Sequence, residues 1–109
     1  MTAFEDAVAA LFADPHLAVV ARYRAGGRGE GVSLRVIRRM PDRVVGFGEG
    51  RIVAGTGMFD VPVAAAPDLA AGDTFEIGGD RWRVQGTPLA DPDRLIWTAE
   101  AAPVPRAGA

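Results

Sequence analysis

Few residues of this 109-residue chain have side chains that perform catalysis. The chain contains one histidine, His16, and one serine, Ser33, but no cysteine and no lysine. The lack of cysteine excludes disulfides, thiolate nucleophiles and cysteine-ligated metal sites, and the lack of lysine excludes a phosphate-binding or Schiff-base lysine. Ser33 opens a predicted strand and does not occupy the strained turn of a nucleophile elbow. A serine–histidine hydrolase is therefore not indicated.

Four carboxylates come in close pairs that could bind a metal ion or exchange protons: Asp91 with Asp93, and Glu76 with Asp80. The sequence Asp-Pro-Asp is typical of a turn, and the second pair flanks Gly-Gly in a predicted hairpin, where acidic side chains are usually solvated. We therefore predict no metal site, no cofactor and no enzymatic activity.

A glycine-rich segment lies in the middle of the chain. Its sequence GFGEG matches part of a dinucleotide-binding loop, but Arg51 stands where the third glycine of that fingerprint belongs, and no helix is predicted after it. Because glycine permits backbone conformations that other residues avoid, the segment favours a mobile loop instead. The residues of this predicted loop are Val45, Gly46, Phe47, Gly48 and Gly50.

Charge is distributed unevenly along the sequence. Residues 1–21 carry three acids and no base, residues 22–43 carry seven arginines against two acids, and residues 44–109 carry five arginines against nine acids. A basic segment of this kind is typical of contact with nucleic acid or with an acidic protein surface, and also of a solvated hairpin face. Strand alternation would place Arg35 and Arg39 on one side and Arg38 on the other. The residues predicted to face a partner or DNA are Arg35, Arg38, Arg39 and Arg43.

The elements that would position these residues are one helix followed by short strands. Residues 3–13 place apolar side chains at helical spacing, behind a capping box formed by Thr2 and Glu5. Alternating residues predict strands and a Gly-Gly hairpin within residues 17–23, 32–40, 58–63, 73–86 and 95–99. The fold class is therefore mainly β: a small antiparallel barrel or sandwich of six or seven strands with one N-terminal α-helix.

The sequence also indicates the bounds of the domain and its core. We expect a single domain over residues 1–102 and a flexible tail over residues 103–109. The helix residues Phe4, Leu11 and Phe12 are expected to pack on interior strand residues, namely Val36, Phe75, Ile77, Trp82 and Val84. No apolar stretch approaches the ~20 residues of a membrane span, and acids stand where a signal peptide carries bases. We therefore expect no contact with a membrane.

Three segments, taken in order, carry a resemblance to a known family: FEDAVAALFADPHLAVVARY at the start, VSLRVIRRMPDRVVGFGEGRI in the centre and GDTFEIGGDRWRVQG near the end. Together they resemble the small head–tail joining proteins of long-tailed phages. These are the lambda-type head-completion or stopper proteins, with relatives in prophages and gene transfer agents. The resemblance covers residues 4–99.

The resemblance implies a non-enzymatic structural protein that forms a ring, expected to be a hexamer, in the neck of a virion or virus-like particle. Portal or adaptor proteins would lie above the ring, and a tail terminator or other tail proteins below it. Packaged DNA would occupy the channel, and the predicted glycine-rich loop would line that channel. The free chain is expected to be a monomer in the host cytoplasm that joins the ring only during assembly.

Two other functions stay open at this point. The arginines favour an oligonucleotide-binding barrel, but Tyr23 is the only aromatic residue near them, whereas single-strand binders present several aromatic platforms. A tail terminator or minor tail protein from the same assembly pathway is the other alternative.

Overall fold

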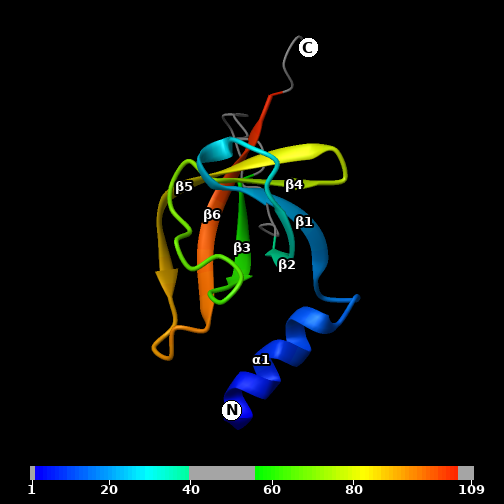
Figure 1. Ribbon diagram of the computed structural model, residues 1–109, viewed down its shortest axis with the longest axis vertical. Helices are drawn as coiled ribbons and strands as arrows, with labels where there is room; N and C mark the ends of the chain where they lie inside the picture. Colours follow the sequence, from blue (N-terminus) through cyan, green and yellow to red (C-terminus); the bar gives the residue numbers. More distant parts are fainter. Residues whose placement is uncertain (1, 40–55, 106–109) are drawn as a thin grey trace, which may run out of the picture.

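The computed structural model describes residues 2–39 and 56–105 of the chain. Within them, one α-helix, one short 3-10 helix and six β-strands follow one another. In chain order these are α1 (Ala3–Ala13), β1 (Val19–Arg24), η1 (Ala25–Gly27), β2 (Val32–Arg39), β3 (Gly57–Pro62), β4 (Thr74–Ile77), β5 (Asp80–Ala90) and β6 (Ile96–Val104). Figure 1 shows α1 lying beyond one end of the strands.

The ends of α1 follow from its sequence. The Thr2 side chain accepts a hydrogen bond from the Glu5 N–H at 3.0 Å, and the Glu5 carboxylate accepts one from the Thr2 N–H at 2.7 Å. This reciprocal capping box satisfies backbone donors that the helix leaves free, and it confirms the predicted start. The helix ends at Ala13 because Asp14, which precedes Pro15, adopts an extended backbone.

The six strands close into an antiparallel barrel with the order β1-β2-β3-β6-β5-β4. The barrel closes where β4 pairs with β1, so that Phe75 lies opposite Tyr23. The predicted mainly β fold with one N-terminal helix is confirmed, and the barrel is the form it takes.

The predicted Gly-Gly hairpin is confirmed. Phe75 lies opposite Trp82 across the β4–β5 pair. Gly78 and Gly79 connect the strands with φ values of 59° and 91°. Positive φ at both central residues is what a two-residue hairpin turn requires for its twist to match the flanking strands.

Two strands are longer than the sequence predicts. β5 continues past Gly86 to Ala90, and its pairing with β6 is irregular between Gln85 and Leu89. This irregularity accommodates a glycine and a proline that otherwise mark the end of a strand. β6 runs on to Val104, opposite Arg81, so residues 103 and 104 belong to the barrel and not to a tail. Residues 106–109 of the predicted tail lie outside the described residues.

Side chains from all six strands fill the barrel. Four aromatic rings contact one another in a row inside it, with centroids 5.5 or 5.6 Å apart. Phe75 stacks on Phe59, whereas Tyr23 is tilted against Phe75 and Trp82 is tilted against Phe59. Aromatic pairs at this separation add about 0.5–1.5 kcal/mol each beyond the area that they bury. The strand residues predicted for the core are buried, except that Ile77 is only partly so.

The helix packs outside this core, contrary to prediction. Phe4 and Leu11 are 46% and 42% exposed, so the expected packing of these two side chains on the barrel interior is wrong. Phe12 is buried, but it belongs to a second cluster with Val8 and Ala18, which Ile37, Leu95 and Ile96 border. The physical reason is that the closed barrel fills its interior from its own strands, so α1 can cover only residues at one end.

A buried carboxylate fixes the connection between β1 and β2. Asp73 accepts hydrogen bonds from the Gly26 N–H at 2.7 Å, from the Ala70 N–H at 2.9 Å and from the Tyr23 hydroxyl at 2.6 Å. Such bonding is what makes a carboxylate tolerable inside a protein. Gly31 ends the same connection with a φ of +74°, and a Cβ atom there would overlap the Tyr23 carbonyl oxygen. Only glycine fits at this position.

Candidate interaction surfaces

Arg35 holds α1 against the barrel. Its Nε donates a hydrogen bond of 2.7 Å to the carbonyl oxygen of Phe12 in the last turn of the helix. The last turn of α1 contains no basic residue. Arg35 of β2 therefore supplies the positive charge that a helix C-terminus favours, next to carbonyl groups that the helix leaves free.

Arg38 and Arg39 point in opposite directions, as strand alternation predicts. Arg38 lies opposite the interior residue Phe59, and its guanidinium is 5.3 Å from the ring centre of Trp82. Arg39 points outward and forms an ion pair of 2.8 Å with Asp60 on β3. Both arginines remain exposed. The other predicted site residues lie outside the described residues: Arg43, Val45, Gly46, Phe47, Gly48 and Gly50.

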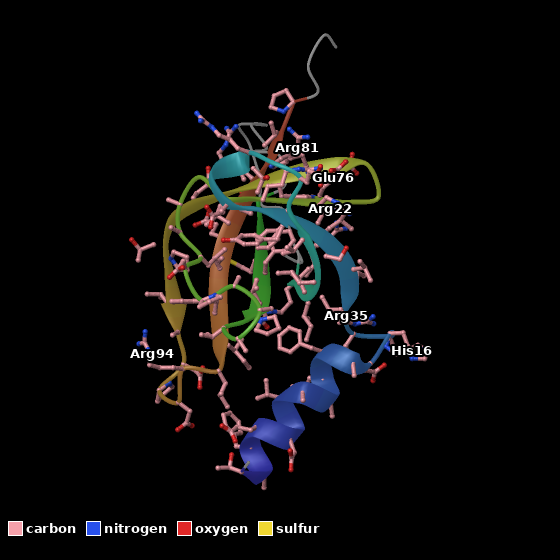
Figure 2. All side chains as sticks on the ribbon, viewed as in Figure 1. His16, Arg22, Arg35, Glu76, Arg81 and Arg94 are labelled. Carbon is pink, nitrogen blue, oxygen red and sulfur yellow. The ribbon has the colours of Figure 1, made fainter. Side chains whose placement is uncertain are left out.

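A different set of arginines converges on the outer side of β1, β4 and β5. Across these strands Arg22 lies opposite Glu76, and Glu76 lies opposite Arg81. The next row aligns Arg24, Thr74 and Arg83 in the same way. Neighbouring strands are about 4.8 Å apart, so the charged groups form a compact patch. We call Arg22, Arg24, Arg81 and Arg83 the arginine face; Figure 2 shows its labelled members, with Glu76, at the end of the molecule remote from α1.

Glu76 is the carboxylate within the arginine face. Its Oε1 accepts a hydrogen bond of 2.7 Å from Nη1 of Arg24. This bond and the charge of Arg24, followed by the charges of Arg81 and Arg22, hold the pKa of Glu76 below its usual value. Four arginines against one carboxylate give the arginine face a net positive charge, although Glu100, exposed on β6 opposite Gln85, adds a negative charge at its border.

The arginine face has a fixed part and an open part. Arg22 and Arg24 donate hydrogen bonds to loop carbonyl oxygens, of Glu30 at 2.8 Å and of Gly29 at 3.0 Å, and the Arg24 side chain is only 19% exposed. Arg81 and Arg83 are exposed along β5. The open part therefore offers guanidinium groups to solvent from a rigid strand.

The solvent side of α1 is apolar. Five exposed residues share this side at helical spacing, and we call them the outer face of α1: Ala3, Phe4, Ala7, Ala10 and Leu11. The charged residues of α1 are Glu5 and Asp6. Glu5 is engaged in the capping box, whereas Asp6 is exposed beside the outer face. The outer face of α1 thus combines apolar area with negative charge.

A family model described as phage head-tail attachment protein matches residues 1–101. The chain belongs to this family. The match spans α1 and extends into β6, so it agrees with the resemblance carried by the three sequence segments. Membership gives the chain a structural role in the attachment of phage heads to tails. No curated protein matches the chain.

In this head-tail attachment protein, Asp91 serves the turn between β5 and β6. Its carboxylate accepts hydrogen bonds from the backbone N–H groups of Ile96 and Leu95, both at 2.7 Å, and of Asp93 at 3.0 Å. The bond from Ile96, with those from the other backbone groups, holds the pKa of Asp91 below its usual value. The turn interpretation of Asp-Pro-Asp is confirmed.

The remaining candidates for chemistry lie on exposed parts of the protein. His16 follows α1, where its N–H donates to the Asp14 carboxylate at 2.8 Å, and Ser33 lies opposite Arg22 in the β1–β2 pair. Among residues 2–39 and 56–105, no three metal-ligating side chains gather closely enough to hold an ion. No helix within the same residues is long and apolar enough to cross a membrane.

Arg81 and Arg83 could not be grouped with Arg22 and Arg24 from the order of residues alone, because they lie in a segment that is acidic overall. The available signal was alternation: in the sequence Arg-Trp-Arg-Val both arginines point away from the buried tryptophan. The pairing of β4 with β1 then joins the two pairs of arginines. No local pattern encodes that long-range contact.

Proposed function

We propose that the chain is a neck component of a tailed phage or gene transfer agent particle, of the stopper type. It forms a ring of six copies below the portal or adaptor, retains the packaged DNA and provides a platform for the tail. The observation that carries this proposal is the family match over residues 1–101. Assembly takes place in the host cytoplasm, and the free chain is a monomer.

The shape and charge of the molecule support a ring. In the closed barrel each of the six described strands pairs with two neighbours, which favours association of copies through side-chain surfaces over the addition of strands. A ring of identical subunits uses heterologous contacts, in which one face meets a different face of the neighbour. The acidic, apolar helix and the arginine face are two such different faces on one molecule.

The arginines predicted from the sequence have separate roles in this proposal. Arg38 and Arg39 are exposed and remain candidates for contact with DNA or with a neighbouring neck protein. Arg35 contributes indirectly, by positioning α1 through Phe12. Arg43 stays in the proposal as a residue that faces a partner. The glycine-rich segment 45–50 stays in it as the lining of the channel. Both assignments rest on the sequence.

An oligonucleotide-binding barrel is the second candidate, and the arginine face favours it, since clustered arginines bind phosphates. Binding of single strands also relies on exposed aromatic rings that stack on bases. The four contacting rings of this barrel, Tyr23, Phe59, Phe75 and Trp82, are buried in the core and cannot serve that purpose. The stopper proposal is therefore preferred.

Deletion of the gene in a host that produces the particles tests the stopper assignment against the tail-terminator alternative. We expect filled heads that lose their DNA, because no stopper retains it after packaging. We also expect separate tails of normal length, because the heads lack the platform to which tails attach. Expression of the intact chain should restore complete particles. Tails of irregular length would assign the chain to tail termination, and normal particles would overturn both roles.

A further inference from the structure

We propose that the outer face of α1 in one copy docks on the arginine face of the next copy. The inference rests on the proposed function, because it names the two surfaces through which subunits of the ring meet. The partner at the arginine face is accordingly a second copy of this chain.

The helix side of this contact is apolar with negative charges at its border. Phe4 and Leu11 on the outer face of α1 are large apolar side chains left open to solvent. Exposed apolar rows on a surface helix are typical of partner contact. Asp6 lies beside the row and Asp14 at its C-terminal end, and residues 2–21 contain no arginine.

The sheet side offers the complementary combination. Arg81 and Arg83 of β5 lie opposite Val104 and Ala102 of β6, on the same outer side. Val20 is exposed two residues before Arg22, on the outer side of β1. The arginines are therefore bordered by apolar residues. Their stems can cover apolar helix residues while their guanidinium groups reach carboxylates.

The two surfaces cannot meet within one molecule. Figures 1 and 2 show α1 at one end and the labelled residues of the arginine face, Arg22 and Arg81, near the other. The hydrogen bond from Arg35 to Phe12 fixes the end of α1 on the barrel. A contact between the surfaces therefore joins different copies head to tail, the type of contact that closes into a ring when the rotation allows.

Glu76 favours a protein partner over DNA at this surface. Its carboxylate lies at the centre of the arginine face, between Arg22 and Arg81. A phosphate backbone is a continuous line of negative charge and would pass close to this carboxylate, which repels it. Separate carboxylates on a helix can pair with the arginines on either side, and such charge complementarity fixes the register of a contact.

Disulfide trapping tests the contact directly, because the chain has no cysteine of its own. One chain carries Ala7→Cys on the outer face of α1 and Gln85→Cys next to Arg83. At about 1 mM, a concentration that populates weak contacts, we expect a ladder of linked dimers, trimers and larger species. Two control chains should give no ladder: Ala7→Cys alone, and Ala7→Cys with Leu89→Cys, an exposed position at the other end of β5.

Charge reversal shows whether the linked species form through the contact between the outer face of α1 and the arginine face. Asp6→Arg, or Arg81→Glu with Arg83→Glu, should each reduce linkage about tenfold, a change that corresponds to about 1.4 kcal/mol. Combining both reversals in one chain should restore most of the linkage. All these positions are exposed, and an unchanged circular dichroism spectrum verifies that each variant is folded.

Three results would overturn the proposal. They are linkage that the charge reversals do not reduce, linked dimers from Ala7→Cys alone, and no linked species at all. A mobility shift with duplex DNA that needs Arg81 and Arg83 while linkage does not would assign the face to DNA and would likewise overturn it. This experiment and the test of the proposed function can give different answers. Trapping uses the purified chain, whereas the neck role is read from particles, so either can fail while the other stands.

Discussion

Tyr23 shows how single polar residues are held inside the barrel. Its hydroxyl donates a hydrogen bond of 2.6 Å to the buried Asp73 carboxylate. Burial, this bond and the nearby negative charge raise the pKa of Tyr23 well above its ordinary value. Because the folded state holds the proton more tightly, the associated stability is fully present below the unfolded pKa of about 10. It is lost as the pH rises through the pKa of the folded state.

An alkaline titration tests this residue cleanly, since Tyr23 is the only tyrosine. We expect ultraviolet absorbance to show no tyrosinate at about pH 10, the ordinary pKa, while circular dichroism stays native. Tyrosinate should appear together with unfolding at higher pH. In Tyr23→Phe, stability should depend less on pH in the alkaline range. Tyrosinate formed near pH 10 in the folded protein would contradict the buried hydrogen bond.

Phe75 is the residue on which the barrel core depends most clearly. It is fully buried, stacks on Phe59 and makes a tilted ring contact with Tyr23. Phe75→Ala should lower the free energy of unfolding by about 3–5 kcal/mol, measured by denaturant titration. Leu89→Ala removes an apolar side chain that is 68% exposed, and it should change stability by no more than about 0.5 kcal/mol. Equal losses in the two variants would show that the interior has been misassigned.

At the scale of elements, α1 is an attachment to the barrel and not part of its core. Val8 and Phe12 bury one narrow side of the helix against the barrel end. Arg35 adds a hydrogen bond and a charge at the helix C-terminus. The position of α1 thus depends on β2 as much as on the helix sequence itself.

Hydrogen exchange measures that dependence. Arg35→Met keeps the apolar stem but removes a charged hydrogen bond worth about 1.5–3 kcal/mol. Amide protons of α1 should then exchange at least about tenfold faster, because a tenfold change needs only about 1.4 kcal/mol. Arg39→Met removes an arginine that pairs with Asp60 and does not touch α1, so helix exchange should stay unchanged. Equal exchange rates in α1 of both variants would remove Arg35 from this role.

Features that depend on residues close together in the sequence were predictable from it. The capping box at Thr2 and the Gly-Gly turn of the β4–β5 hairpin are both confirmed. The burial of Phe4 and Leu11 was predicted wrongly because helical spacing identifies a stripe but not its partner. β5 was predicted too short because Gly86 has the local signature of a strand end, whereas pairing with β6 carries the strand past it.

At the scale of the whole molecule, closure of the barrel creates the candidate surface. Arg22 and Arg81 are far apart in the sequence, and they become neighbours only through β4. The sequence predicted a basic surface on Arg35, Arg38, Arg39 and Arg43, and that assignment stays a prediction. In the structure Arg35 and Arg39 lie on the outer side of β2 and Arg38 on the inner side, and each contacts a different residue. A surface composed of distant strands requires the fold before it can be recognised.

The free chain is predicted to be a monomer that assembles only on the portal or adaptor. The barrel has its own filled core, so we expect it to fold without a partner. A circle of sites on the assembly would raise the local concentration of neighbours without any new contact. Sedimentation at roughly tens of micromolar, where only tight contacts persist, should show a single monomeric species. A stable ring without other particle proteins would contradict assembly on a template.

Electron cryomicroscopy of intact particles is the measurement that tests the neck assignment most directly. The account predicts a ring between the portal or adaptor and the tail, with each subunit fitted by the six-strand barrel and its N-terminal helix. In that ring, α1 of each subunit should lie against β1, β4 and β5 of the next. Particles whose neck contains no such barrel, or in which this chain lies along the tail tube or at the tail tip, would contradict the account.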